Sequence, residues 1–199
     1  YAERALAKHP YIKPHHTFHD LLVIKCDLET SDLVDRGIWK SSEEDRKRLS
    51  DMVADYCYKY VLEILKVSRP VIARLAEMYP LVLVSNFYGN IETILADFDL
   101  QYFKHIVESA VVGIRKPDPR IFQLGVDALR KVTGKSDKEL PASNILVVGD
   151  SFSKDIVPAN EIGCKTVWIK GVGWGNEETD DSIPTFIIKN IAELENILG

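Results

Sequence analysis

Residues 144–151 have the sequence Asn-Ile-Leu-Val-Val-Gly-Asp-Ser, in which an apolar run rich in valine ends at a glycine and an acidic residue. A short, wholly apolar run of this kind is typical of a parallel β-strand that is buried on both faces. Gly149 allows the chain to leave the strand in a tight turn, and Asp150 follows at once. In doubly wound sheets the functional groups lie just beyond the carboxyl ends of the strands, so this stretch predicts both a fold and the place of a site.

The rest of the second half of the chain repeats the alternation of strand and helix. A second valine-rich run, residues 81–85, has the sequence Leu-Val-Leu-Val-Ser. Further strands are expected at 106–112, 165–169 and 186–188, and helices at 70–79, 91–98, 119–132, 156–162 and 191–198. Strands that alternate with helices indicate βαβ units. We therefore expect residues 69–199 to form an α/β domain with a Rossmann-like, doubly wound parallel sheet.

The first 68 residues differ, because their apolar residues recur mostly at helical spacing. Ser41-x-x-Glu44 is a capping-box pattern that predicts the start of a long helix. Residues 1–68 are therefore expected to form an α-helical domain. The sequence begins at Tyr1, and its opening residues resemble the interior of a helix, so we expect this domain to be incomplete at its start.

Composition and charge restrict the possible functions. The chain contains 25 lysines and arginines and 30 acidic residues, a net charge of −5, which disfavours a nucleic-acid-binding protein because such proteins normally carry a basic surplus. No apolar run is long enough to span a bilayer. Three widely separated cysteines, Cys26, Cys57 and Cys164, indicate reduced thiols. We expect a cytoplasmic protein without nucleic-acid or membrane partners, and the sequence leaves its oligomeric state open.

Two positions that follow expected strands carry residues suited to an anion. Ser85 and Asn86 end the run at 81–85, and a hydroxyl with nearby backbone N–H groups can bind phosphate, although the same pair is common in ordinary turns. Lys116 lies in residues 113–119, Gly-Ile-Arg-Lys-Pro-Asp-Pro, where two prolines stiffen the backbone and begin a helix. A lysine on so stiff a loop can act as a fixed positive charge, although a surface lysine beside a helix that begins with proline is a frequent alternative.

A third strand end supplies carboxylates. Asp150 and Asp155 follow residues 144–148, and two carboxylates at such a place suit a hard cation such as Mg²⁺, which takes few protein ligands and keeps several waters. The alternative is a turn at Asp150, with Asp155 as an acid in the first turn of a helix. Taken together, the three strand ends supply a hydroxyl that can bind phosphate, a fixed cation and candidate metal ligands.

These residues resemble the haloacid dehalogenase superfamily of phosphoryl-transfer enzymes. Its second motif, a Ser or Thr that ends an apolar strand, matches Ser85. Its third, a lysine in a G-x-x-K-P-x-P-x-x-F setting, matches residues 113–122, and its fourth, G-D-S followed by a further Asp, matches 149–155. The resemblance covers about residues 70–175, and the helical stretch before them is similar in type to the cap domain that this family inserts after its first strand.

The resemblance implies a Mg²⁺-dependent phosphatase that acts on a small phosphorylated substrate through an aspartyl-phosphate. Ser85 would hydrogen-bond the transferring group, and Asn86 would supply amide contacts to the substrate. Lys116 would neutralise charge on the nucleophile and the phosphoryl oxygens. Asp150 would bind Mg²⁺, and Asp155 would support the metal site or hold Lys116.

The family's first motif, D-x-D-x-T after an apolar strand, has no clear counterpart. Asp27, with Glu29 two residues on, is its nearest match, but a lysine interrupts the preceding apolar run. We expect instead that the nucleophile lies upstream of this sequence, on a strand that the family places between the strands ending at Ser85 and Asp150. The chain alone is then expected to be inactive.

Two other functions fit part of the pattern. A carbon–halogen hydrolase of the same superfamily would need no Mg²⁺, and the intact Gly149-Asp150-Ser151 favours the phosphatase. A non-catalytic binding or regulatory protein, which kept the pocket without the nucleophile, would belong to a different class. Metal dependence distinguishes the first alternative from the phosphatase, and the upstream sequence distinguishes the second from both.

Overall fold

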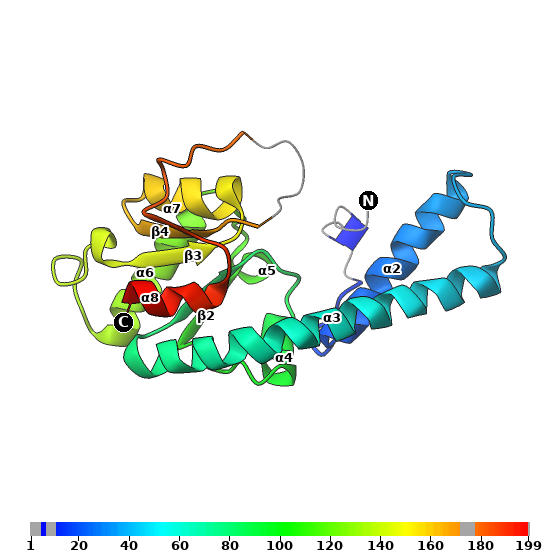
Figure 1. Cartoon of the computed structure of the whole chain (residues 1–199), viewed down its shortest axis with the longest axis horizontal. Coiled ribbons are helices and arrows are strands. Elements are labelled where there is room, and N and C mark those ends of the chain that lie inside the picture. Colours follow the sequence, from blue (N-terminus) through cyan, green and yellow to red (C-terminus); the bar gives the residue numbers. More distant parts are fainter. Residues whose placement is uncertain (1–4, 7–10, 172–177, 199) are drawn as a thin grey trace. The chain divides into compact units, whose positions relative to one another are not determined.

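The computed structural model describes residues 5–6, 11–171 and 178–198. The chain divides into two compact units, which are described separately. Unit 1 comprises residues 1–69 and 87–101, and unit 2 comprises 70–86 and 102–199. Residues 87–101 were expected within the α/β domain, but their contacts group them with the helical unit. Figure 1 shows the elements of both units in sequence colours.

Unit 1 is built from helices. They are α2 (Phe18–Asp35), most of α3 (Glu43–Met78) and α4 (Ile91–Asp97). A capping box opens α2, because the Thr17 hydroxyl accepts from the Asp20 amide and the Asp20 carboxylate accepts from the Thr17 amide. The apolar face of α2 is buried at Leu21, which packs with Leu6 and Ile12.

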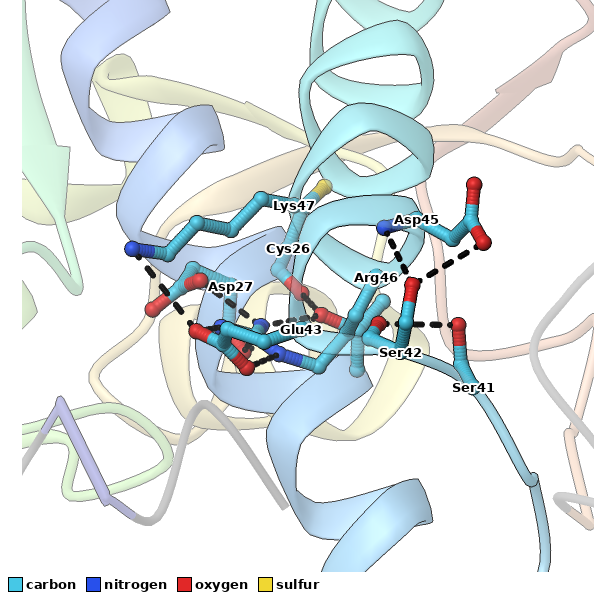
Figure 2. A network of polar contacts seen from close by, with 9 residues as sticks. Cys26, Asp27, Ser41, Ser42, Glu43, Asp45, Arg46 and Lys47 are labelled. Atoms are coloured by element: carbon cyan, nitrogen blue, oxygen red, sulfur yellow. Dashed lines mark hydrogen bonds and ion pairs between the residues drawn. The ribbon is translucent and has the colours of Figure 1, made fainter.

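The start of α3 corrects the predicted cap by one residue. Ser42, rather than Ser41, precedes the helix, and its hydroxyl accepts from the Asp45 amide at 3.1 Å and donates to the Asp45 carboxylate at 2.9 Å. Ser41 instead donates to the Ser42 carbonyl at 3.1 Å (Figure 2). Two adjacent serines offer the same cap chemistry, and the helix phase that buries Arg46 decides between them.

A buried arginine joins α2 to α3 within unit 1. The Arg46 guanidinium donates to the Asp27 carboxylate at 2.7 Å and to the Thr30 hydroxyl at 3.0 Å, both on α2. It also donates to the two carboxylate oxygens of Glu43, at 3.0 and 2.9 Å. Figure 2 shows these bonds converging on one side chain. The ion pairs with Glu43 and Asp27 raise the pKa of Arg46, so it is charged at every relevant pH.

The expected helix start at Pro70 is wrong. α3 continues through Pro70 to Met78, and its residues from Pro70 onward belong to unit 2. A proline inside a helix removes one backbone hydrogen bond, which makes it a common place for a helix to begin. Here the burial of Val71 and Leu75 in the core of unit 2 favours the continuation of the helix over its next two turns.

Within the described residues, unit 2 contains five parallel strands. They are β1 (Val82–Ser85), β2 (His105–Glu108), β3 (Leu146–Gly149), β4 (Lys165–Ile169) and β5 (Phe186–Ile188). They form two hydrogen-bonded sheets, β1–β2 and β3–β4–β5. Among the described strands, none pairs with β1 on the edge opposite β2, and none pairs with β3 on the edge opposite β4.

Helices cover both faces of these strands, as a doubly wound fold requires. The elements concerned are α5 (Ser109–Val112), α6 (Arg120–Thr133), the turn η1 (Ala142–Asn144), the π-helical turn η2 (Phe152–Ile156), α7 (Val157–Glu161), the turn η3 (Ile191–Glu193) and α8 (Leu194–Leu198). One core packs α6 and α7 against β2. A second packs the end of α3 and α8 against Val167 of β4. The predicted fold class is confirmed, whereas the strand expected at 106–112 ends at Glu108 and continues as α5.

β1 and β3, which each have one edge without a partner strand among the described residues, are less buried than β4. Val167 in β4 is fully buried, as expected of a strand with a neighbour on each side. β1 is half-buried along its whole length, and Val148 of β3 is 39% exposed. The prediction that β1 and β3 are buried on both faces is therefore wrong within the described residues, because each has one edge without a partner strand.

Candidate active site

The predicted site residues lie at the carboxyl ends of β1 and β3. Ser85 is the last residue of β1 and pairs in register with Glu108 of β2. Gly149 ends β3, and Asp150 follows it. Lys116 lies in the loop between α5 and α6, after Gly113, whose φ of +70° ends α5 in the left-handed conformation.

The ammonium of Lys116 connects the ends of the two sheets. It donates to the Asp155 carboxylate at 2.6 Å and lies 3.4 Å from the carbonyl oxygen of Val84 in β1. The two charged side chains are mostly buried, with exposures of 15% for Lys116 and 7% for Asp155. The Phe122 ring lies 5.9 Å from the ammonium, which adds a weak attraction. A buried cation is thus fixed where both strands end.

Asn86 fixes the backbone of the same lysine. Its side-chain amide donates to the Lys116 carbonyl at 3.0 Å, and its side-chain oxygen accepts from the Lys116 amide at 2.8 Å. The Asn86 side chain thus bonds both the carbonyl and the amide of one residue, as a neighbouring β-strand does. The sequence led us to expect that Asn86 contacts the substrate, whereas the structure shows both ends of its side chain bonded to Lys116.

Asp155 is held from two further directions. Its second carboxylate oxygen accepts from the Ser151 amide at 3.1 Å. The π-helical turn η2 directs its side chain inward. A Cβ on Gly149 would lie 2.3 Å from the Cβ of Asp155, so the close approach of η2 to the end of β3 requires a glycine there. Both oxygens of Asp155 have partners, and the carboxylate therefore serves as a fixed counter-ion for Lys116.

Asp150 and Ser85 differ from Asp155, because their side-chain oxygens have no hydrogen-bond partner among the described residues. The Asp150 side chain is exposed, while its backbone carbonyl accepts from the Trp168 indole at 3.1 Å. Neither the Asp150 carboxylate nor the Ser85 hydroxyl bonds to a side chain or backbone group of the described residues. A fixed cation, a free hydroxyl and a free carboxylate at strand ends are the groups that bind a phosphoryl group and a metal ion.

Comparison with protein families gives the class of the chain. The haloacid dehalogenase-like hydrolase family matches residues 32–163. The chain belongs to this family. Among curated relatives, the glyceraldehyde 3-phosphate phosphatase of Methanopyrus kandleri is 32% identical over 99 residues, which cover 49% of this chain and 39% of that protein. The pyrimidine 5′-nucleotidase YjjG of Escherichia coli is 30% identical over 97 residues, with the same two coverages of 49% and 39%.

Solved structures of haloacid dehalogenase-like proteins share the fold. A phosphatase from Thermococcus onnurineus aligns with a TM-score of 0.56 at 22% identity, covering 91% of this chain and 92% of that one. A 2-haloacid dehalogenase from Pseudomonas syringae aligns with a TM-score of 0.52 at 24% identity, covering 99% and 77%. The chain matches between 25% and 39% of the length of curated glyceraldehyde 3-phosphate phosphatases.

At the strand ends of this haloacid dehalogenase-like chain, one carboxylate is available as a ligand for a magnesium ion. The described residues hold no group of three or more His, Cys, Asp or Glu side chains able to bind a metal together. Asp155 is occupied by Lys116 and Ser151, which leaves Asp150 as the free carboxylate at these strand ends. One carboxylate is compatible with Mg²⁺, because this ion is commonly bound by one or two carboxylates together with water and substrate oxygens.

Asp27 is not placed like the nucleophile of this family. It lies in the middle of α2, in unit 1, and its carboxylate pairs with Arg46 at 2.7 Å (Figure 2). The family's nucleophile follows a strand, and α2 is a helix throughout.

Two of the three cysteines, Cys26 and Cys164, are poor candidates for a nucleophile. All three are free, and burial raises the pKa of the Cys164 thiol to about 11. Burial also raises the pKa of Cys26. A thiol with a raised pKa is protonated at neutral pH and is a poor nucleophile.

Within the described part of the chain, no helix combines the length and apolarity needed to cross a bilayer.

Sequence reasoning missed two contributors to the site. The Val84 carbonyl faces the Lys116 ammonium, and the Trp168 indole holds the Asp150 backbone. A backbone carbonyl leaves no signal in a sequence. Trp168 does leave one, since an indole N–H in a buried strand needs an acceptor, and parallel β3–β4 pairing places it level with Gly149.

Proposed function

We propose that this protein is a Mg²⁺-dependent phosphatase that hydrolyses a small phosphomonoester through an aspartyl-phosphate. The observation that supports it most is the Lys116 ammonium, fixed by Asp155 at 2.6 Å and by the Asn86 bonds to its backbone, at the ends of β1 and β3. Phosphoryl transfer depends mainly on charge placed in advance, and a lysine held at three points is such a charge.

The proposed role of each residue follows from whether its polar side-chain atoms already have hydrogen-bond partners. The Ser85 hydroxyl hydrogen-bonds an oxygen of the transferring phosphoryl group, and Lys116 stabilises the negative charge shared by that group and the attacking carboxylate. Asp155 keeps the ammonium in position, and Asn86 keeps its backbone there. Asp150 supplies a carboxylate to the metal. Bound Mg²⁺ supplies positive charge that neutralises the phosphoryl oxygens.

The nucleophile is assigned to a strand outside this sequence. The free edges of β1 and β3 support this assignment, because a further parallel strand between them would end beside Lys116. Such a strand would also give each open edge a partner. Unit 1 is then the cap domain, to which the proposal assigns the selection of the substrate.

The test compares two proteins in a phosphatase assay. One is the 199-residue chain, and the other is the protein expressed from its complete coding sequence. With p-nitrophenyl phosphate and Mg²⁺, we expect turnover by the second and none by the first. Asp27→Asn is the control and should change neither result. Turnover by the 199-residue chain that Asp27→Asn abolishes would overturn the assignment of the nucleophile.

Metal dependence separates the phosphatase from the carbon–halogen hydrolase. Chelation by EDTA is expected to abolish phosphatase turnover, and added Mg²⁺ should restore it. Asp150→Asn should raise the Mg²⁺ concentration needed for half-maximal activity. Metal-independent halide release from a 2-haloacid, with no phosphatase activity, would favour the dehalogenase instead.

A further inference from the structure

Trp168 bonds the chain at the point where β3 ends. It lies in β4, level with Gly149 of the neighbouring strand β3, and only 6% of its surface is exposed. Its indole N–H donates to the backbone carbonyl of Asp150 at 3.1 Å. Asp150 is one residue beyond the last pair of the β3–β4 ladder. The indole bond therefore extends the contact between the two strands by one residue.

The indole ring is itself fixed by its neighbours. It packs against Phe152 with 5.2 Å between the ring centroids, and both rings share an apolar cluster with the fully buried Ile156. The ammonium of Lys170 lies 4.8 Å from the centroid of the indole ring and donates to the Asp181 carboxylate at 2.7 Å. These contacts leave the indole little freedom to turn, so its N–H points in a set direction.

The carboxylate of Asp150 depends on this backbone for its position. The side chain is exposed, and its oxygens have no hydrogen-bond partner among the described residues. Two rotatable bonds join the carboxylate to the backbone, so the place of the backbone decides which points the carboxylate can reach. Mg²⁺ requires near-ideal octahedral geometry, with ligand distances of about 2.0–2.1 Å. A small displacement of the Asp150 backbone would therefore weaken a magnesium site that this carboxylate serves.

We propose that Trp168 is a positioning residue for magnesium, because its indole bond holds the Asp150 backbone where the carboxylate can reach the ion. The inference rests on the proposed function, in which Asp150 is a metal ligand. Groups that orient a metal ligand commonly change the metal affinity by about 10–100-fold when they are removed. The indole bonds the backbone of the ligand residue rather than its side chain, so the carboxylate keeps both oxygens for the ion and its waters.

A purely structural role is the alternative for Trp168. A buried indole N–H needs an acceptor in any case, and the Asp150 carbonyl would then serve only that need. The two roles predict different results. A structural bond affects the stability of the fold and leaves the magnesium affinity of the folded protein unchanged, whereas a positioning bond affects both.

The first experiment measures Mg²⁺ binding without substrate by isothermal titration calorimetry, on the protein expressed from the complete coding sequence. Trp168→Phe keeps an aromatic ring and removes the N–H donor, and it should raise the dissociation constant for Mg²⁺ about tenfold. Asp150→Asn, which removes the charge of the ligand, should raise it further. Trp39→Phe, the same substitution in unit 1, is the matched control and should leave the dissociation constant unchanged.

A second control separates the N–H donor from the packing of the ring. Ile156→Val removes one methylene group from the cluster that surrounds the indole and keeps the donor. It should lower the midpoint of urea unfolding and leave the dissociation constant for Mg²⁺ unchanged. Urea unfolding of every variant also confirms that each one is folded during the titration.

A spectroscopic measurement tests the hydrogen bond itself. The indole N–H of Trp168 gives one resonance in the NMR spectrum of isotope-labelled protein, and the loss of that resonance in Trp168→Phe assigns it. Added Mg²⁺ should shift this resonance, because its acceptor belongs to the residue that binds the ion. In Asp150→Asn the same shift should require a higher Mg²⁺ concentration.

Three outcomes overturn the inference. An unchanged Mg²⁺ affinity in Trp168→Phe, beside a weakened one in Asp150→Asn, would give the indole a structural role and leave the proposed function standing. An equal loss of affinity in Trp168→Phe and Ile156→Val would assign the effect to packing. Mg²⁺ binding that Asp150→Asn does not weaken would remove Asp150 from the metal site, and would overturn both the inference and that part of the proposed function.

Discussion

Arg46 in unit 1 and Lys116 in unit 2 are both cations with little exposed surface, 6% and 15% of the side chain. Their partners differ. Each of the three guanidinium nitrogens of Arg46 donates to an acceptor on its own unit. The Lys116 ammonium has one short bond, to Asp155 at 2.6 Å, and one long approach, to Val84 at 3.4 Å. Among the described residues, its third hydrogen has no acceptor.

The difference separates a structural charge from one that is available to a ligand. Every guanidinium nitrogen of Arg46 has an acceptor, and its bonds to Asp27 and Thr30 join α2 to α3. Lys116 is fixed in position but not saturated, so it can still bind an anion without moving. Electrostatic catalysis requires a charge that is fixed in place and still has a free hydrogen-bond donor, because such a charge needs no reorganisation when the reaction occurs.

Removal of the Lys116 ammonium should have the largest effect. In the protein expressed from its complete coding sequence, Lys116→Met is expected to lower kcat by about 10²–10³-fold. It also leaves the buried Asp155 carboxylate without its counter-ion, so the free energy of unfolding should fall by about 3–5 kcal/mol. Steady-state kinetics on the folded fraction, measured beside urea unfolding, separates the two effects. An unchanged kcat would remove Lys116 from the reaction.

Arg46→Met should affect stability alone. The substitution keeps the apolar volume and leaves Asp27 and Thr30 without their donor, which should lower the free energy of unfolding by about 1–3 kcal/mol. Asp27 and Glu43 are partly exposed, so water replaces some of the lost bonds. Arg48→Ala, which removes an exposed pair with Asp45, is the control and should leave the midpoint of urea unfolding nearly unchanged. A loss of kcat with no loss of stability in Arg46→Met would break the comparison.

Asn86→Ala tests how Lys116 is positioned. The substitution leaves the Lys116 amide and carbonyl without partners, and we expect kcat to fall about tenfold with KM nearly unchanged. Asn86→Asp keeps the acceptor for the Lys116 amide and should lie between wild type and alanine. A rise in KM with kcat unchanged would instead return Asn86 to the substrate-binding role expected from the sequence.

The smallest expected effect is that of low pH, which should reduce the stability that the bonds between Arg46 and Glu43 provide. The hydrogen bonds from Arg46 lower the pKa of Glu43 below its usual value of 4.5. A carboxylate whose pKa is lower in the folded state stabilises the fold above its unfolded pKa, and this contribution is lost as the pH falls through the folded pKa. The melting temperature of wild type should therefore exceed that of Glu43→Gln by no more than about 3 °C at pH 7, and this difference should shrink as the pH falls below the usual pKa of Glu43. A difference that stays constant as the pH is lowered would show that the charge of Glu43 is not its cause.

Local sequence patterns predicted elements well where burial and pattern agree. β4 and β5 have the bounds expected for them, and α6 is shifted by one residue. The errors occur where two local solutions are close in energy. Ser41 and Ser42 are equally good caps, residues 109–112 suit a strand or a helical turn, and Pro70 suits a helix start or an interior position. Packing of the rest of the chain decided each of these cases.

For the site, the sequence by itself determined which residues stand at strand ends, because a valine-rich run that stops at Ser85 or Gly149 carries that information locally. Tertiary structure alone decided their partners. Lys116 meets Asn86 across 30 residues and Asp155 across 39, and only the packing of these segments in space brings them together. Asp155 contacts the Lys116 ammonium in the structure, and its support of a metal site stays a prediction. Contacts between residues so far apart depend on how strands pack in space, which no local pattern encodes.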